Sequence, residues 1–203
     1  MPKISDERRA ARRTQILEAA WTCFQRQGLH ATTMDDIIRS AGLSAGAVYS
    51  YFPSKEELIL AAVTGSLGGL RDLVGPILGA RPLPAPDVLV TQIMEAVARF
   101  TARDGYDLRR IALLGWSEAQ RNDGLRETMK AYYLPFRAGL EAAATEWRVA
   151  GLLPPQASAP DVAKAILAMV LGFVVQSAIL GDVEPADIPQ GLLGLGAGPG
   201  RAQ

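Results

Sequence analysis

The spacing of the apolar residues constrains the fold of this chain most strongly. Apolar side chains recur three and four residues apart along most of the sequence, and few stretches alternate apolar with polar residues. The first pattern is typical of amphipathic helices, whereas the second would indicate half-buried strands. The sequence therefore predicts an all-α fold.

Cap signals divide the start of the chain into helices. Gly28 is expected to end a first helix over residues 6–27, because glycine commonly closes a helix. Thr32, followed by Asp35 three residues later, resembles a capping box and predicts the start of a second helix. That helix is expected to end at Gly42.

Further helices follow to the end of the chain. Ser44 is expected to cap a third helix through Tyr51, and the pair Ser54 and Glu57 forms a capping box for a longer fourth helix. Three prolines in residues 79–87 then predict a loop. The later helices are predicted over residues 86–103, 107–121, 124–150 and 160–181.

Length and composition narrow the class of protein. A chain of 203 residues can bury a sizeable core, and a single cysteine, Cys23, forms no disulfide within the chain and no metal site, which fits a reducing cytoplasm. The charged start lacks the apolar stretch of a secretory signal. The most apolar run, residues 165–175, is shorter than the roughly 20 residues that span a membrane. We therefore expect a cytoplasmic protein with no membrane partner.

The two short helices around Gly42-Leu43-Ser44 have the proportions of a helix-turn-helix, whose second helix enters the major groove of DNA. An ordinary helical hairpin inside a core would also account for the apolar spacing. DNA binding is favoured by Tyr49, Tyr51 and Lys55 on the polar side, and by six basic against three acidic residues among the first 26.

The stretch "LHATTMDDIIRSAGLSAGAVYSYFPSKEELI", residues 29–59, resembles the DNA-binding domain of the TetR family of bacterial transcriptional regulators. The resemblance is close over residues 12–60 and looser in the later helices. It implies an N-terminal three-helix helix-turn-helix domain, residues 1–55, joined by a connecting helix to a larger helical domain. That second domain, residues 56–203, would bind an effector and form a dimer, with residues 189–203 as a partly flexible tail.

The resemblance also implies roles for individual residues. Phosphate contacts are expected from Thr33, Tyr49, Tyr51 and Lys55. Positions facing or beside base edges are expected to be Ser44, Ala45, Gly46, Ala47 and Ser50. Residues 44–52 contain no Arg, Lys, Asn or Gln, which are the usual bidentate readers of guanine and adenine. We therefore expect a palindromic operator that is read partly through thymine methyl groups and DNA shape.

The later helices hold the candidates for an effector pocket. Aromatic side chains can form apolar walls and a few polar groups can orient a ligand. The candidates are Trp116, Tyr132, Tyr133, Phe136, Trp147, Phe173 and Gln176. For each aromatic residue, plain core packing is the competing interpretation.

The helix at residues 160–181 is expected to carry the dimer, because it is apolar nearly all round and Gly172 would let a partner backbone approach. The last stretch is rich in glycine, and each interior glycine costs about 1 kcal/mol of helix stability relative to alanine. A final helix is therefore expected to be short, or frayed beyond about Leu195.

Together these features predict a TetR-like one-component regulator, a repressor that binds double-stranded operator DNA as a homodimer. A small-molecule effector, apolar or aromatic, would release it. We expect no enzyme activity, no cofactor and no metal, because no nucleophile with a base, phosphate loop or metal-spaced cluster is evident. The alternatives are a helical ligand-binding or scaffold protein that has lost DNA affinity, and an enzyme built on a helical bundle.

Overall fold

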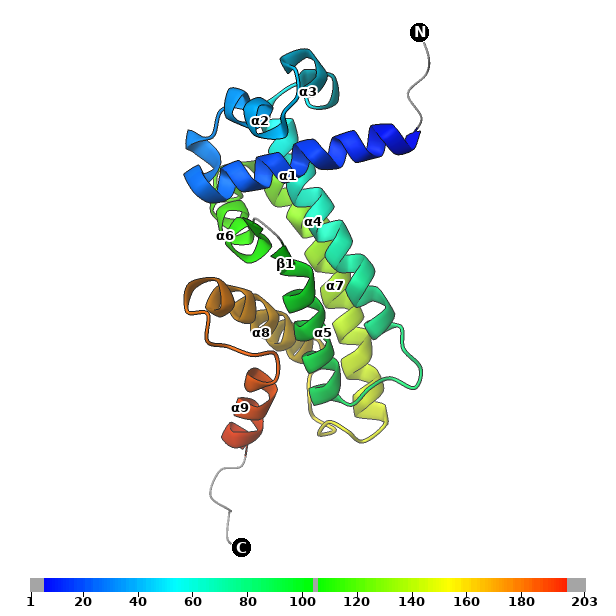
Figure 1. The fold of residues 1–203 in the computed structure, drawn as a ribbon. Coiled ribbons are helices and arrows are strands. Elements are labelled where there is room, and N and C mark those ends of the chain that lie inside the picture. Colours follow the sequence, from blue (N-terminus) through cyan, green and yellow to red (C-terminus); the bar gives the residue numbers. More distant parts are fainter. Residues whose placement is uncertain (1–5, 104–105, 197–203) are drawn as a thin grey trace, which may run out of the picture. The chain divides into compact units, whose positions relative to one another are not determined.

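The computed structural model describes residues 6–103 and 106–196, and this part of the chain is almost entirely helical (Figure 1). The strands found there are β1 (Ala102–Arg103) and β2 (Tyr106–Asp107), which pair antiparallel. The predicted all-α fold is confirmed. The short hairpin was not expected, because two residues per strand are too few to show alternation.

The chain divides into two compact units. The first unit, Met1–Leu67 and Ala102–Thr128, contains α1 (Asp6–Ala31), α2 (Met34–Ala41), α3 (Ala45–Tyr51), α6 (Leu108–Glu118), the hairpin, and the first parts of α4 (Lys55–Leu78) and α7 (Asp123–Val149). The second unit, Gly68–Thr101 and Met129–Gln203, contains the rest of α4 and α7, and α5 (Pro86–Thr101), α8 (Ala159–Ile179) and α9 (Asp187–Gly196). The functional division at residue 55 stays a prediction.

The junction between α1 and α2 differs from the expected one by a single residue. Gly28 leaves helical geometry as predicted (φ 81°, ψ 166°), but a further short turn continues to Ala31. The residue that caps α2 is Thr33, not Thr32. Thr32 is buried, and its hydroxyl donates to the carbonyl oxygen of Gly28 at 2.8 Å. The buried Thr32 side chain therefore bonds back to α1, and Thr33 caps α2 instead.

In the first unit, α1 supplies the core on which α2 packs, and Figure 1 shows α2 and α3 as short neighbouring helices. Ile16, Ala20 and Phe24 recur at helical spacing and are buried on α1. On the helix-turn-helix, Ile37 of α2 and Val48 of α3 are fully buried. The apolar pattern thus places the helix-turn-helix on α1.

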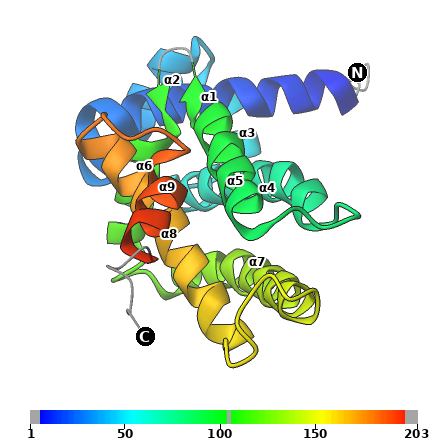
Figure 2. The same ribbon diagram turned by 90° about the horizontal axis from the view of Figure 1, so that it is seen from below.

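In the second unit, α5 contacts both α8 and α9 (Figure 2). Leu89, Ile93 and Val97 form one buried row on α5, spaced four residues apart. On α8, the buried face includes Ile166 and Phe173. The predicted fraying beyond Leu195 falls mainly on residues 197–203, which lie outside the described part of the chain.

Two of the described helices, α4 and α8, are long and apolar enough to cross a membrane by length and composition alone. This criterion is weak evidence, because core helices of soluble proteins also meet it. The apolar run at residues 165–175 is too short to span a membrane by itself, but it lies within α8, which has 21 residues. Most of the apolar window on each helix is not buried, so α8 keeps an apolar surface that a partner could cover.

Candidate nucleic-acid interface

The turn between α2 and α3 is built by local hydrogen bonds. Gly42 takes the left-handed conformation (φ 65°), which a residue with a side chain resists, and its N–H donates to the carbonyl oxygen of Arg39 at 3.3 Å. Ser44 then caps α3, because its hydroxyl oxygen accepts from the N–H of Ala47 at 3.3 Å. The predicted helix-turn-helix is therefore present, with both expected cap residues in place.

One side of α3 is anchored and the other is exposed. Val48 and Phe52 are buried and fix the helix to the first unit. The expected base-reading residues lie on the outer side, where Ser44, Ala45, Gly46 and Ser50 are exposed and Ala47 is half-buried. Tyr49 is 44% exposed and Tyr51 is half-buried. The structure thus presents a small, uncharged surface that can approach another molecule closely.

Arginines of α1 lie beside this surface. The guanidinium of Arg9 lies 6.0 Å from the ring centre of Tyr51, and that of Arg13 lies 5.3 Å from the ring centre of Phe52. Arginine stacks on aromatic faces through cation–π attraction, which orients its charge. Two positive charges are therefore held next to the C-terminal end of α3.

Thr33 begins α2 through a reciprocal capping box. The N–H of Asp36 donates to the Thr33 hydroxyl oxygen at 3.2 Å, and the Thr33 N–H donates to the Asp36 carboxylate at 3.0 Å. The Thr33 hydroxyl also donates to that carboxylate at 2.6 Å. These hydrogen bonds, with Arg39 nearby, hold the pKa of the Asp36 carboxyl below its usual value.

Thr33→Val is expected to raise the pKa of Asp36 towards its ordinary value, because valine keeps the shape of threonine and removes the hydroxyl. A lowered pKa in the folded state adds stability above the unfolded pKa, and that stability disappears as pH falls through the folded value. The free energy of unfolding of the variant should therefore depend less on pH in the acid range. Carboxyl titration by NMR measures this, with Asp161, whose lowered pKa comes from Lys164 and Ser158, as the unchanged control.

Lys55 has partners that were not expected. Its ammonium donates to the carbonyl oxygens of Leu29 and His30 at 3.1 Å each and of Thr32 at 3.0 Å. The expected phosphate contact of this side chain stays a prediction, in competition with these three bonds. No local sequence signal indicates them, because the partners lie far from Lys55 in the chain.

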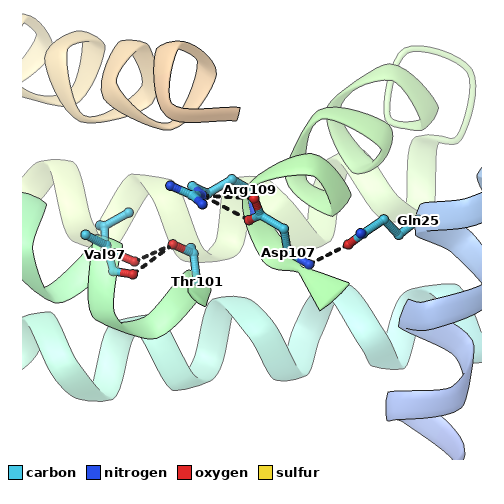
Figure 3. A network of polar contacts seen from close by, with 6 residues as sticks. Gln25, Val97, Thr101, Asp107 and Arg109 are labelled. Atoms are coloured by element: carbon cyan, nitrogen blue, oxygen red, sulfur yellow. Dashed lines mark hydrogen bonds and ion pairs between the residues drawn. The ribbon is translucent and has the colours of Figure 1, made fainter. Parts of the chain in front are cut away.

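Polar and aromatic contacts join α6 to α1 in the first unit. The Asp107 N–H donates to Gln25 Oε1, and the Asp107 carboxylate caps α6 and pairs with Arg109 at 2.9 Å (Figure 3). The rings of Trp21 and Tyr106 lie 5.1 Å apart. The start of α6 is therefore attached to α1 by both polar and aromatic contacts.

The end of α6 is attached to α1 as well. His30 Nε2 lies 3.1 Å from Glu118 Oε2, with the histidine side chain 68% exposed and the glutamate 15% exposed. His30 is thus an exposed residue whose partner is distant in sequence. The connection between α1 and α2 thus contacts α6 through His30 and α4 through Lys55.

The candidate pocket residues fall into different environments. Trp147 and Phe173 are each 1% exposed, and the Trp147 Nε1–H donates to the carbonyl oxygen of Pro84 at 2.8 Å. Trp116, Tyr132, Tyr133 and Phe136 are half-buried, whereas Gln176 is exposed on α8. Trp116 belongs to the first unit and the other six belong to the second. The half-buried aromatic residues keep surface that a ligand could contact.

Comparison with known proteins agrees with this geometry. Residues 16–62 match the model of bacterial regulatory proteins of the tetR family, and residues 89–191 match the C-terminal model of the BetI-type transcriptional repressor. The transcriptional regulator BetI of Rhizobium meliloti (strain 1021) is 31% identical over 184 residues, which are 88% of this chain and 83% of that protein.

Two solved structures illustrate the shared fold. A transcriptional regulator from Saccharomonospora viridis in complex with choline has a TM-score of 0.75 at 20% identity, over 92% of this chain and 95% of the other. FadR from Bacillus subtilis in complex with stearoyl-CoA has a TM-score of 0.72 at 15% identity, over 90% and 96%. TetR regulators bind DNA operators, usually as dimers, and respond to small-molecule effectors. The chain belongs to the TetR family of bacterial transcriptional regulators, and it is a TetR-like repressor.

Proposed function

We propose that this protein represses transcription by binding a palindromic operator as a cytoplasmic homodimer, and that a small-molecule effector releases it. The observation that carries the proposal is the exposed outer side of α3, residues 44–50, next to the oriented guanidinium groups of Arg9 and Arg13. A small, uncharged helix can enter the major groove closely, while neighbouring cations neutralise phosphates.

The side chains of α3 define how the operator would be read. Ala45 and Ala47 offer methyl groups to thymine methyls, Gly46 allows close approach, and the remaining specificity comes from DNA shape. Ser44 and Ser50 lie beside the base edges. Phosphate contacts come from the groups expected at the surface, Thr33, Tyr49 and Tyr51, whereas Lys55 reaches phosphate only by giving up a bond to a carbonyl oxygen.

The effector would bind among the helices of the C-terminal part and would be apolar or aromatic. The half-buried Tyr132, Tyr133 and Phe136 on α7 supply candidate walls. The choline and stearoyl-CoA complexes of the two structural neighbours indicate that this fold accepts ligands with a large apolar part or a weakly hydrated cation. An effector that prefers the form with wrongly spaced reading helices weakens DNA binding by the same coupling free energy.

The dimer would form on the open side of α8. Ala168 and Gln176 are exposed there, Gly172 is half-buried, and Ile179 is 66% exposed. Small residues along one line let two helices approach closely, and the surrounding apolar atoms supply the driving force. Two copies of α3 would then face successive turns of the same DNA groove.

Selection of bound sequences from random DNA tests the proposal with the purified full chain. Recovery of a palindrome with A·T-rich half-sites is the expected result. Binding that stays weak and independent of sequence would favour the alternative, a helical ligand-binding or scaffold protein whose motif has lost DNA affinity. The same operator then allows a search for compounds that release it.

Tyr49→Phe is expected to weaken binding by roughly two- to tenfold on every DNA sequence, because it removes one hydrogen bond to phosphate and keeps the ring. The preferred bases should stay the same. Fluorescence anisotropy with operator and scrambled DNA measures both effects, and Tyr132→Phe on α7 is the matched control. A change in base preference would show that Tyr49 reads bases instead.

A further inference from the structure

The ammonium of Lys55 occupies an unusual position for a group expected to bind phosphate. It is the first residue of α4, and its three bonds reach the carbonyl oxygens of Leu29, His30 and Thr32 at 3.0 to 3.1 Å. A lysine ammonium has three N–H donors and no acceptor. Its hydrogen-bonding capacity is therefore fully used inside the protein.

The carbonyl groups that Lys55 binds need an outside donor. Gly28 leaves helical geometry, so the turn after it cannot continue the regular hydrogen bonding of α1. The last carbonyls of a helix have no partner within the helix and carry the negative end of its dipole. Leu29 and Thr32 are also buried, where an unpaired carbonyl is costly. A compact cation at this point satisfies three such groups together.

The segment that Lys55 holds leads directly into the DNA-binding helices. Thr32 is followed by Thr33, whose capping box with Asp36 begins α2, and α2 leads through Gly42 into α3. Fixing the carbonyl of Thr32 to the start of α4 therefore fixes where α2 begins. The direction of α3 follows from that of α2, because the turn between them is short and tightly bonded.

We propose that Lys55 is a positioning residue for operator recognition, which ties the end of α1 and the start of α2 to α4, and that it is not a phosphate ligand. The inference rests on the proposed function as a DNA-binding repressor. It assigns the specificity of α3 partly to a side chain that does not touch DNA.

The salt dependence of operator binding separates the two roles. If Lys55 binds a phosphate, Lys55→Met lowers the slope of log affinity against log salt by about 0.9, equally on operator and scrambled DNA. If Lys55 positions α2, the same substitution leaves the slope unchanged and reduces operator affinity at least tenfold, with little effect on scrambled DNA. The second result is expected, and the first would overturn the proposal.

Lys55→Arg adds a second comparison. Arginine binds phosphate at least as well as lysine, but its planar fork cannot place three donors on carbonyls that converge on one point. We expect Lys55→Arg to lose operator affinity as Lys55→Met does, whereas full retention would indicate a phosphate ligand. Ile93→Val, a substitution at a buried position of α5, controls for a general loss of stability. It should lower Tm modestly and leave the ratio of operator affinity to scrambled-DNA affinity unchanged.

NMR of the unmutated protein provides a test that does not depend on variants folding. The Lys55 ammonium signal should exchange slowly with water in the free protein and should keep its position when operator is added. Loss of this protection with a new coupling to phosphorus on DNA binding would contradict the inference. Wild-type protein that binds no DNA would instead refute the proposed function, and the free-protein spectrum would still report on the three carbonyl bonds.

Discussion

Gly172→Glu is expected to convert the protein from dimer to monomer and to lower its affinity for a palindromic operator by about 10²- to 10⁴-fold. A Cβ at Gly172 would meet nothing within 4 Å in a single chain, so the substitution itself creates no clash there. In the proposed interface, however, it places a charge among apolar atoms without a partner, which is costly. The large loss in affinity follows because a monomer engages one half-site only.

Sedimentation and operator binding measure this prediction together. Gly172→Ala is the closest control, because alanine favours the helix and adds no charge, and it should stay dimeric. Ala142→Glu introduces the same charge at an exposed position of α7 and should also stay dimeric. A Gly172→Glu protein that remained dimeric and bound DNA would place the interface on another surface.

The parts of the fold that depend on neighbours in sequence were predictable. Gly42 and Ser44 define the turn by their own conformational preferences, so the boundaries of α3 agree with the expectation. The choice between Thr32 and Thr33 was not predictable in the same way. Both side chains can cap a helix, and burial of Thr32 decides the outcome, which is a property of the packed structure.

The polar contacts of the site were less predictable, because their partners are distant in sequence. Neither the bonds of Lys55 to residues 29–32 nor the pair between His30 and Glu118 leaves a periodic or local pattern. The outer side of α3 is exposed, where small residues flank the buried Val48. The sequence could therefore indicate the exposed side of the helix-turn-helix, and it could not show which side chains hold that side in position.

Aromatic residues at helical spacing show a similar limit. Among the seven pocket candidates, the pattern could not separate Trp147 and Phe173, which are almost completely buried, from Tyr132 and Phe136, which keep accessible surface. Both kinds occupy inward-facing positions of amphipathic helices. Burial distinguishes them, and it gives each kind a different expected effect of substitution.

Trp147→Ala is expected to lower the free energy of unfolding by about 3–5 kcal/mol, because it empties a fully packed site. For a chain of this size that corresponds to a fall in Tm of roughly 6–20 °C. Thermal unfolding followed by circular dichroism measures the change. Trp147→Phe should cost less, since it keeps a six-membered ring, although it removes the five-membered ring of the indole and the bond from Nε1 to the carbonyl oxygen of Pro84.

Phe136→Ala is the matched comparison for Trp147→Ala, because it removes a half-buried ring from the same helix. Its effect on Tm should be clearly smaller, since the half-buried ring contributes less buried apolar surface to the folded state. If Phe136 lines the effector site, Phe136→Ala should raise the effector concentration that is needed to release the operator. A Trp147→Ala protein with unchanged Tm but an altered effector response would show that Trp147 contacts the ligand rather than filling the core.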